Sequence, residues 1–70
     1  MKANNLDEID RQIIRTMADC NMRVSAVARR MDFHRNSIVY HIERIKGETG
    51  LDPMRFYDLV QLIKEMEEQE

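Results

Sequence analysis

The 70-residue chain has little material for turns or cross-links: it contains two glycines, one proline and one cysteine. With 43% hydrophobic and 34% charged residues, this composition predicts a mostly helical domain. The single Cys20 excludes an intramolecular disulfide. No apolar run approaches the roughly 20 residues that span a bilayer, and the N-terminal segment lacks the apolar core of a signal peptide. We therefore expect one all-α domain over residues 1–70, located in the cytoplasm.

Apolar residues at helical spacing divide the chain into four predicted helices. Asn5 and Glu8 are spaced as a capping box for the first helix, and the glycine-containing segment 47–50 supplies the exit from the third. Asp52 is the expected cap of the fourth helix, with Pro53 at its first position. The fold is thus a three-helical core followed by a C-terminal helix. The predicted bounds are about 6–18, 24–31, 35–46 or 47, and 53–68.

The stretch 24–45, VSAVARRMDFHRNSIVYHIERI, predicts two short amphipathic helices around a tight turn, a helix-turn-helix over about residues 24–46. Ala28 is small where the two helices must cross closely, and Asp32 with Phe33 forms the turn. Ile38 and Ile42 lie on one face of the second helix. Its start carries polar side chains, in the part that such proteins insert into the major groove: His34, Arg35, Asn36 and Ser37.

The net charge of the whole chain is −2, which by itself disfavours a polyanionic partner. The charge is, however, unevenly distributed along the sequence. Residues 23–46 carry +4, residues 47–70 carry −5, and residues 1–22 carry −1. The positive charge therefore coincides with the predicted helix-turn-helix. Such segregation is expected of a phosphate-facing surface, although a solvated helix face would produce the same pattern.

The segment HRNSIVYHIERIKGETG resembles the C-terminal helix-turn-helix of PucR-type transcription regulators, and the resemblance covers roughly residues 6–66. A more distant likeness to the Fis-type module rests on Ala28, Arg35 and Ile38. The resemblance implies a DNA-binding output domain, usually joined in that family to an upstream sensory region, so the chain is either standalone or a fragment. Ser37 replaces the usual Thr, and His41 stands where the family commonly has Arg. The matching residues are His34, Arg35, Asn36, Ile38, Tyr40, Ile42, Ile45, Thr49 and Gly50.

These residues predict sequence-specific binding of double-stranded DNA, with the helix from about Arg35 to Lys46 in the major groove. Arg35 and Asn36 are the favoured base readers, because Arg pairs bidentately with guanine and Asn with adenine. Ser37 and His34 accompany them, and His34 is equally well placed to cap the helix and bond its backbone. Two roles are open for Tyr40, core packing and a contact to the DNA backbone. The expected phosphate contacts are Arg29, Arg30, Tyr40, His41, Arg44 and Lys46.

We expect no catalytic residues, metal, cofactor or small-molecule ligand, and no membrane partner. His34 and His41 share a helix face, but no Cys or carboxylate pair joins them at a zinc-binding spacing. The main alternative is a protein-interaction module without DNA binding, in which the fourth helix pairs with a second copy of the chain. Its apolar residues either form that homodimer surface or pack against the first helix within one chain. They are Phe56, Leu59, Ile63 and Met66.

Overall fold

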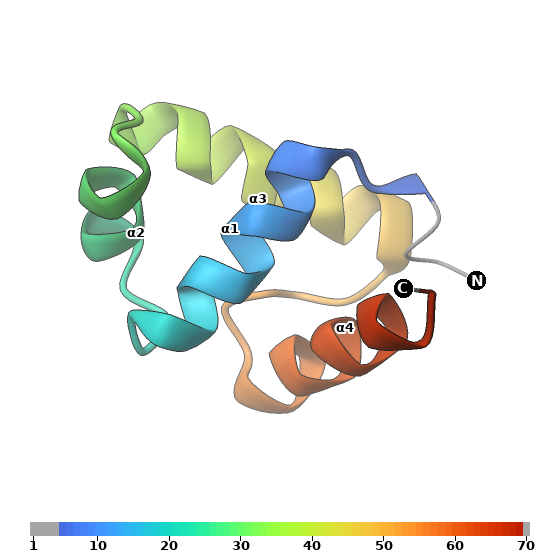
Figure 1. Cartoon of the computed structure of the whole chain (residues 1–70). Helices are drawn as coiled ribbons and strands as arrows, with labels where there is room; N and C mark the ends of the chain where they lie inside the picture. The colour runs from blue at the N-terminus through green and yellow to red at the C-terminus, as the bar shows by residue number, and fades with distance from the viewer. Residues whose placement is uncertain (1–4, 70) are drawn as a thin grey trace.

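A computed structural model describes residues 5–69, which form four helices and, within that range, no strand (Figure 1). The predicted all-α class is therefore confirmed. None of the helices in this range is long and apolar enough to cross a bilayer. The helices are α1 (Glu8–Asp19), α2 (Val24–Met31), α3 (Arg35–Thr49) and α4 (Phe56–Gln69).

The core lies around α1, which packs against each of the other three helices and runs between α3 and α4 in Figure 1. Ile13, Ile14 and Met17 of α1 have no exposed surface. Burying a large aliphatic side chain contributes about 1.5–3 kcal/mol, so this stripe supplies much of the driving force for folding. The other buried apolar residues are Leu6, Cys20, Val27, Ala28, Ile38, Ile42, Ile45, Leu59, Leu62 and Met66.

Helix α4 packs on α1 within the chain, as one of the two interpretations of its apolar stripe predicted. Leu59 and Met66 are 3% and 1% exposed, so their assignment to a dimer surface is corrected: both are core residues. Ile63 is half-buried against the core, and Phe56 is 60% exposed. Of the four predicted dimer residues, Phe56 is the one that presents most of its surface to solvent.

Helix α1 begins at Glu8 and not at Leu6, because its capping box is formed by a different pair of residues. The Asp7 carboxylate accepts a hydrogen bond from the Asp10 N–H at 2.8 Å, and the Asp10 carboxylate accepts one from the Asp7 N–H at 3.1 Å. Leu6 is buried ahead of this cap, outside the helix. The predicted box of Asn5 and Glu8 has the same spacing, but it would place Leu6 inside the first turn.

The turn between α2 and α3 is closed by backbone hydrogen bonds that end α2 at Met31, as predicted. Asp32 adopts the left-handed conformation at φ 58°, which a short polar residue tolerates better than a branched one. Its N–H bonds the carbonyl of Arg29 at 3.2 Å, and the Phe33 N–H bonds the carbonyl of Ala28 at 2.8 Å. These bonds fix where α3 starts relative to α2.

Helix α3 continues to Thr49, beyond its predicted end at 46 or 47, so Gly47 lies inside the helix. The buried Thr49 hydroxyl donates to the Ile45 carbonyl at 2.7 Å and accepts from the Leu51 N–H at 3.0 Å. The left-handed residue that ends the helix is Gly50, at φ 74°, whose N–H bonds the Lys46 carbonyl. The helix therefore stops only at the second of the two glycines.

Helix α4 begins at Phe56, three residues after the predicted start at Pro53. Asp52 caps a turn and not the helix: its carboxylate accepts from the Met54 N–H at 2.8 Å. The Asp52 N–H in turn donates to the Asp58 carboxylate at 3.0 Å. Pro53 is buried in this turn, so its fixed backbone angle serves the connection between helices.

Candidate nucleic-acid interface

His34 is the N-cap of α3, and its ring Nδ1 accepts a hydrogen bond from the Asn36 N–H at 3.1 Å. This confirms the capping alternative for His34. A neutral ring with an unprotonated Nδ1 is required for this bond. The start of α3 is thus fixed by a side chain that is itself exposed to solvent.

The first turn of α3 presents three exposed polar side chains: Arg35, Asn36 and Ser37. Among residues 5–69, none of these three side chains forms a hydrogen bond or an ion pair. Their donors and acceptors are directed to solvent next to the Asp32 turn. The predicted base readers are therefore brought together on one accessible turn of helix.

The second turn of α3 adds exposed residues that were not predicted as base readers. Val39 is 36% exposed and Tyr40 is 65% exposed, so the packing alternative for Tyr40 is wrong. Both lie within four residues of Asn36 and, together with the exposed Glu43, share its face of the helix. Ile38 and Ile42 lie on the opposite, buried face. Counting from Asn36 at helical spacing would have found Val39.

His41 and Arg44 lie on the flank of α3 that faces α1, where both bind the carboxylate of Asp10. The His41 Nδ1–Asp10 Oδ1 distance is 2.7 Å, and Arg44 Nε donates to Asp10 Oδ2 at 3.1 Å. Asp10 has no exposed surface, so its charge is stable there only when it is paired and hydrogen-bonded. The structure thus places these two predicted phosphate ligands in an internal ion-pair cluster. Asp10 lies within the apolar stripe of α1, a signal that could have identified it.

The same cluster shifts the pKa of two of its members. The pKa of Asp7 is lowered below its ordinary value of 3.8, chiefly because its carboxylate accepts the Asp10 N–H, and Arg44 adds to the effect. The pKa of Arg44 is raised, chiefly by the charge of Asp10. Asp7 and Arg44 therefore stabilise each other's charged forms.

Asp7, Asp10 and His41 have potential metal-ligand atoms that lie within 4.8 Å of one another. Both oxygens of Asp10 already accept hydrogen bonds, from His41 on one side and from Arg44 and the Asp7 N–H on the other. The Arg44 guanidinium already lies next to both carboxylates, at the position where a metal cation would be most strongly attracted. The arrangement of these three residues is thus accounted for by protein hydrogen bonds.

The remaining basic residues of the predicted phosphate surface lie at the end of α2 and in the second half of α3. Arg29 is exposed, and Arg30 is 3.8 Å from the exposed carboxylate of Asp19. Lys46 lies 3.3 Å from Glu43. Such exposed pairs contribute at most about 1 kcal/mol, so they exchange readily for a phosphate.

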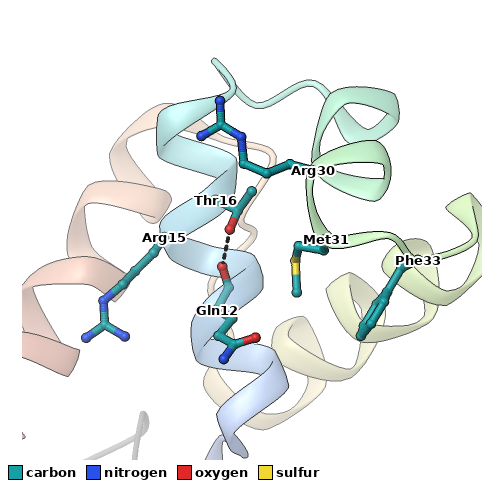
Figure 2. Close-up of a pocket in the computed structure, with 6 residues that line it drawn as sticks. All are labelled: Gln12, Arg15, Thr16, Arg30, Met31 and Phe33. Carbon is teal, nitrogen blue, oxygen red and sulfur yellow. Dashed lines mark hydrogen bonds between the residues drawn. The ribbon is translucent and has the colours of Figure 1, made fainter.

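A surface pocket of about 420 Å³ lies between α1 and the end of α2, with Met31 and Phe33 on one side (Figure 2). Arg15 and Arg30 extend in different directions from it, and Arg15 points away from Met31 and Phe33 (Figure 2). The two guanidinium groups therefore do not converge on one ligand position. The lining residues are Gln12, Arg15, Thr16, Arg30, Met31 and Phe33.

Helices α2 and α3 are joined by a tight turn, and the first helical turn of α3 is polar and exposed. This arrangement defines a helix-turn-helix domain. The chain belongs to the family of the PucR C-terminal helix-turn-helix domain, which matches residues 11–63. The resemblance noted in the sequence is thereby confirmed, and membership in this family indicates DNA binding in a transcription regulator. No curated protein and no solved structure matches the chain.

Proposed function

We propose that this chain is the DNA-binding domain of a cytoplasmic transcription regulator that recognises a specific double-stranded sequence with α3 in the major groove. The observation that carries the proposal is the exposed, unpaired first turn of α3 at Arg35, Asn36 and Ser37. An α-helix fits the major groove, which is about 12 Å wide and displays a distinct pattern for each base pair. No catalytic step is assigned to the domain.

Arg35 and Asn36 are the proposed base readers, directed at guanine and adenine respectively. Ser37 lies beside them with a hydroxyl that both donates and accepts. His34 uses Nδ1 to cap the helix, which leaves Nε2 as its one polar atom for DNA. Each good bidentate pair contributes about 1–3 kcal/mol of discrimination against the wrong base.

Phosphate contacts are proposed for Arg29, Arg30 and Lys46, with the Tyr40 hydroxyl as a further donor. All four lie on α2 or α3, within the segment of positive net charge. His41 and Arg44 receive a different role in the proposal: they orient α3 through Asp10. Phosphate contacts carry affinity but no sequence information, and they weaken steeply with salt.

The test is a titration of random-sequence duplex DNA at low and moderate salt, followed by selection of preferred sequences. Arg35→Ala and Asn36→Ala should relax the preference at single positions, while Arg29→Ala should weaken all sequences alike and lower the salt slope by about 1. Arg55→Ala, an exposed arginine in the turn before α4, is the matched control and should change neither. Absence of salt-dependent binding by the wild-type chain would overturn the proposal.

Homodimerisation through α4 is a second candidate, favoured by exposed apolar residues at the start of that helix. Phe56, Tyr57 and Val60 are 60%, 83% and 46% exposed. Phe56 and Val60 line an apolar groove of about 180 Å³ that also includes Met22 and Ile63. Two copies joined there would present two α3 helices to half-sites on one DNA molecule.

A further inference from the structure

Val39 has a place in the fold that neither helix formation nor the core explains. It lies in the middle of α3, 36% exposed, on a face whose other exposed members are polar or carry a hydroxyl. A β-branched residue is a poorer helix former than alanine, because its side chain loses rotamer freedom against the preceding turn. An exposed valine here therefore costs the helix a little stability without adding to the buried core.

The position of Val39 relative to Asn36 determines which base pairs Val39 would contact in a DNA complex. The two residues are three apart, so they are separated by about 4.5 Å along the helix axis and share a face. Successive base pairs are spaced by about 3.4 Å along the duplex. With Asn36 at a base edge, Val39 falls against the adjoining one or two base pairs.

The isopropyl group of Val39 has no hydrogen-bond donor or acceptor, so it cannot distinguish the polar groups of the base edges. The one apolar group that the four bases display in the major groove is the 5-methyl of thymine. A valine side chain in a helix is held almost entirely in one χ1 rotamer, so little conformational entropy is lost when it makes such a contact. The neighbouring Tyr40 ring packs edge-on against His41, with the ring centroids 5.4 Å apart.

We propose that Val39 is a specificity-determining residue that contacts the 5-methyl group of a thymine next to the base pair read by Asn36. The inference rests on the proposed function, and it adds a requirement for a methyl group at one position of the site. The recognition surface is then mixed: Arg35 and Asn36 read polar groups, and Val39 reads an apolar one. The same chemistry extends to 5-methylcytosine, which displays a methyl group at the same place.

The experiment uses the duplex selected by the wild-type chain, with each thymine replaced singly by deoxyuridine. This replacement removes the methyl group and leaves all hydrogen-bonding groups of the base unchanged. For wild type, replacement at one position should weaken binding by about three- to fivefold, the effect of removing one buried methyl contact. Val39→Ala should bind the thymine and uracil duplexes equally at that position. Met54→Ala, which removes another exposed apolar side chain outside α3, is the control and should keep the wild-type ratio.

The outcomes separate the two proposals. If the chain binds DNA with a sequence preference but no thymine-to-uracil replacement matters, the assignment of Val39 is overturned and the proposed function stands. The assignment also fails if Val39→Ala keeps the full uracil penalty. If the chain binds no DNA, both proposals fall together. The wild-type replacement series alone decides the methyl requirement, so the test does not depend on the folding of a variant.

Discussion

At the scale of single residues, Asp10 joins parts of the chain that are far apart in sequence. Its carboxylate binds His41 and Arg44, which are 31 and 34 residues away, and it also accepts the N–H of the Asp7 cap. A buried carboxylate is costly unless its oxygens are fully used, and here each has a partner. One side chain therefore serves both the start of α1 and the packing of α1 on α3.

Asp10→Ala should lower the free energy of unfolding by about 3 kcal/mol, because it removes the cap bond and leaves His41 and Arg44 without their shared partner. Urea denaturation followed by circular dichroism measures this change. Asp19→Ala is the matched control: Asp19 is exposed and lies 3.8 Å from Arg30, so its loss should cost less than about 1 kcal/mol. Equal effects of the two substitutions would contradict the role given to Asp10.

The lowered pKa of Asp7 predicts a loss of stability in acid. A carboxyl group whose pKa is lower in the folded chain stabilises it above the unfolded value of 3.8, and this contribution is lost as the pH falls through the folded value. The denaturation midpoint should therefore decrease below about pH 4. Asp7→Ser keeps a capping oxygen but no charge, so it should flatten this part of the profile. If the denaturation midpoint of Asp7→Ser falls in acid as steeply as that of the wild type, Asp7 is not the source of the acid sensitivity.

At the scale of helices, apolar periodicity and turn residues predicted some boundaries, and individual side-chain hydrogen bonds decided the others. The bounds of α2 were predictable because the apolar residues around its end and the turn at Asp32 are all local. The end of α3 depends on the buried hydroxyl of Thr49, and the start of α4 depends on the bond between Asp52 and Asp58. Neither contact has a sequence signature.

The candidate site shows the same division. The sequence was sufficient to predict where α3 starts and which polar residues form its first turn, because capping and helical spacing are local properties. It could not predict that His41 and Arg44 face Asp10, because that contact exists only once α1 has packed on α3. Helical spacing could have placed Val39 on the face of Asn36. It did not single out Val39 as exposed, because an apolar residue in a helix is ordinarily expected to be buried.

The two glycines near the end of α3 provide a test of the helix boundary. Gly50→Ala should destabilise the fold by about 1 kcal/mol, because φ is 74° there and an L side chain is strained in that region. Gly47→Ala should stabilise it by up to about 1 kcal/mol, because Gly47 is helical and an added Cβ meets nothing within 4 Å. Thermal denaturation measures both, and effects of the same sign would contradict the observed end of α3.

At the scale of the whole molecule, the segment of positive net charge and the exposed aromatic residues of α4 lie in different parts of the sequence. The segment with a net charge of +4 contains α2 and most of α3, while the acidic segment contains α4. The exposed aromatic residues Phe56 and Tyr57 lie at the start of α4, with their rings in edge contact at 5.3 Å. The proposed DNA surface and the proposed dimer surface thus belong to different helices, so they can be altered independently.

If α4 pairs two copies, the wild-type chain should show a concentration-dependent increase in mass by size-exclusion chromatography with light scattering. Val60→Asp should shift this equilibrium toward the monomer, because it places a charge within an exposed apolar patch. Lys64→Gln, on the same helix, also lowers the net charge by one and is the control for a change of charge alone. A wild-type monomer at high micromolar concentration would remove the dimer proposal and leave DNA binding by single copies intact.

The Asp10 contact also determines the azimuth of α3, the angle of rotation about its own axis. Each residue of an α-helix occupies about 100° of rotation, so a turn by one position would replace Asn36 by a neighbour at the groove. The Asp32 turn fixes one end of the reading segment, and the bonds of His41 and Arg44 to Asp10 fix the other. The set of bases that α3 can address is therefore specified in part by α1, a helix that touches no DNA in the proposed complex.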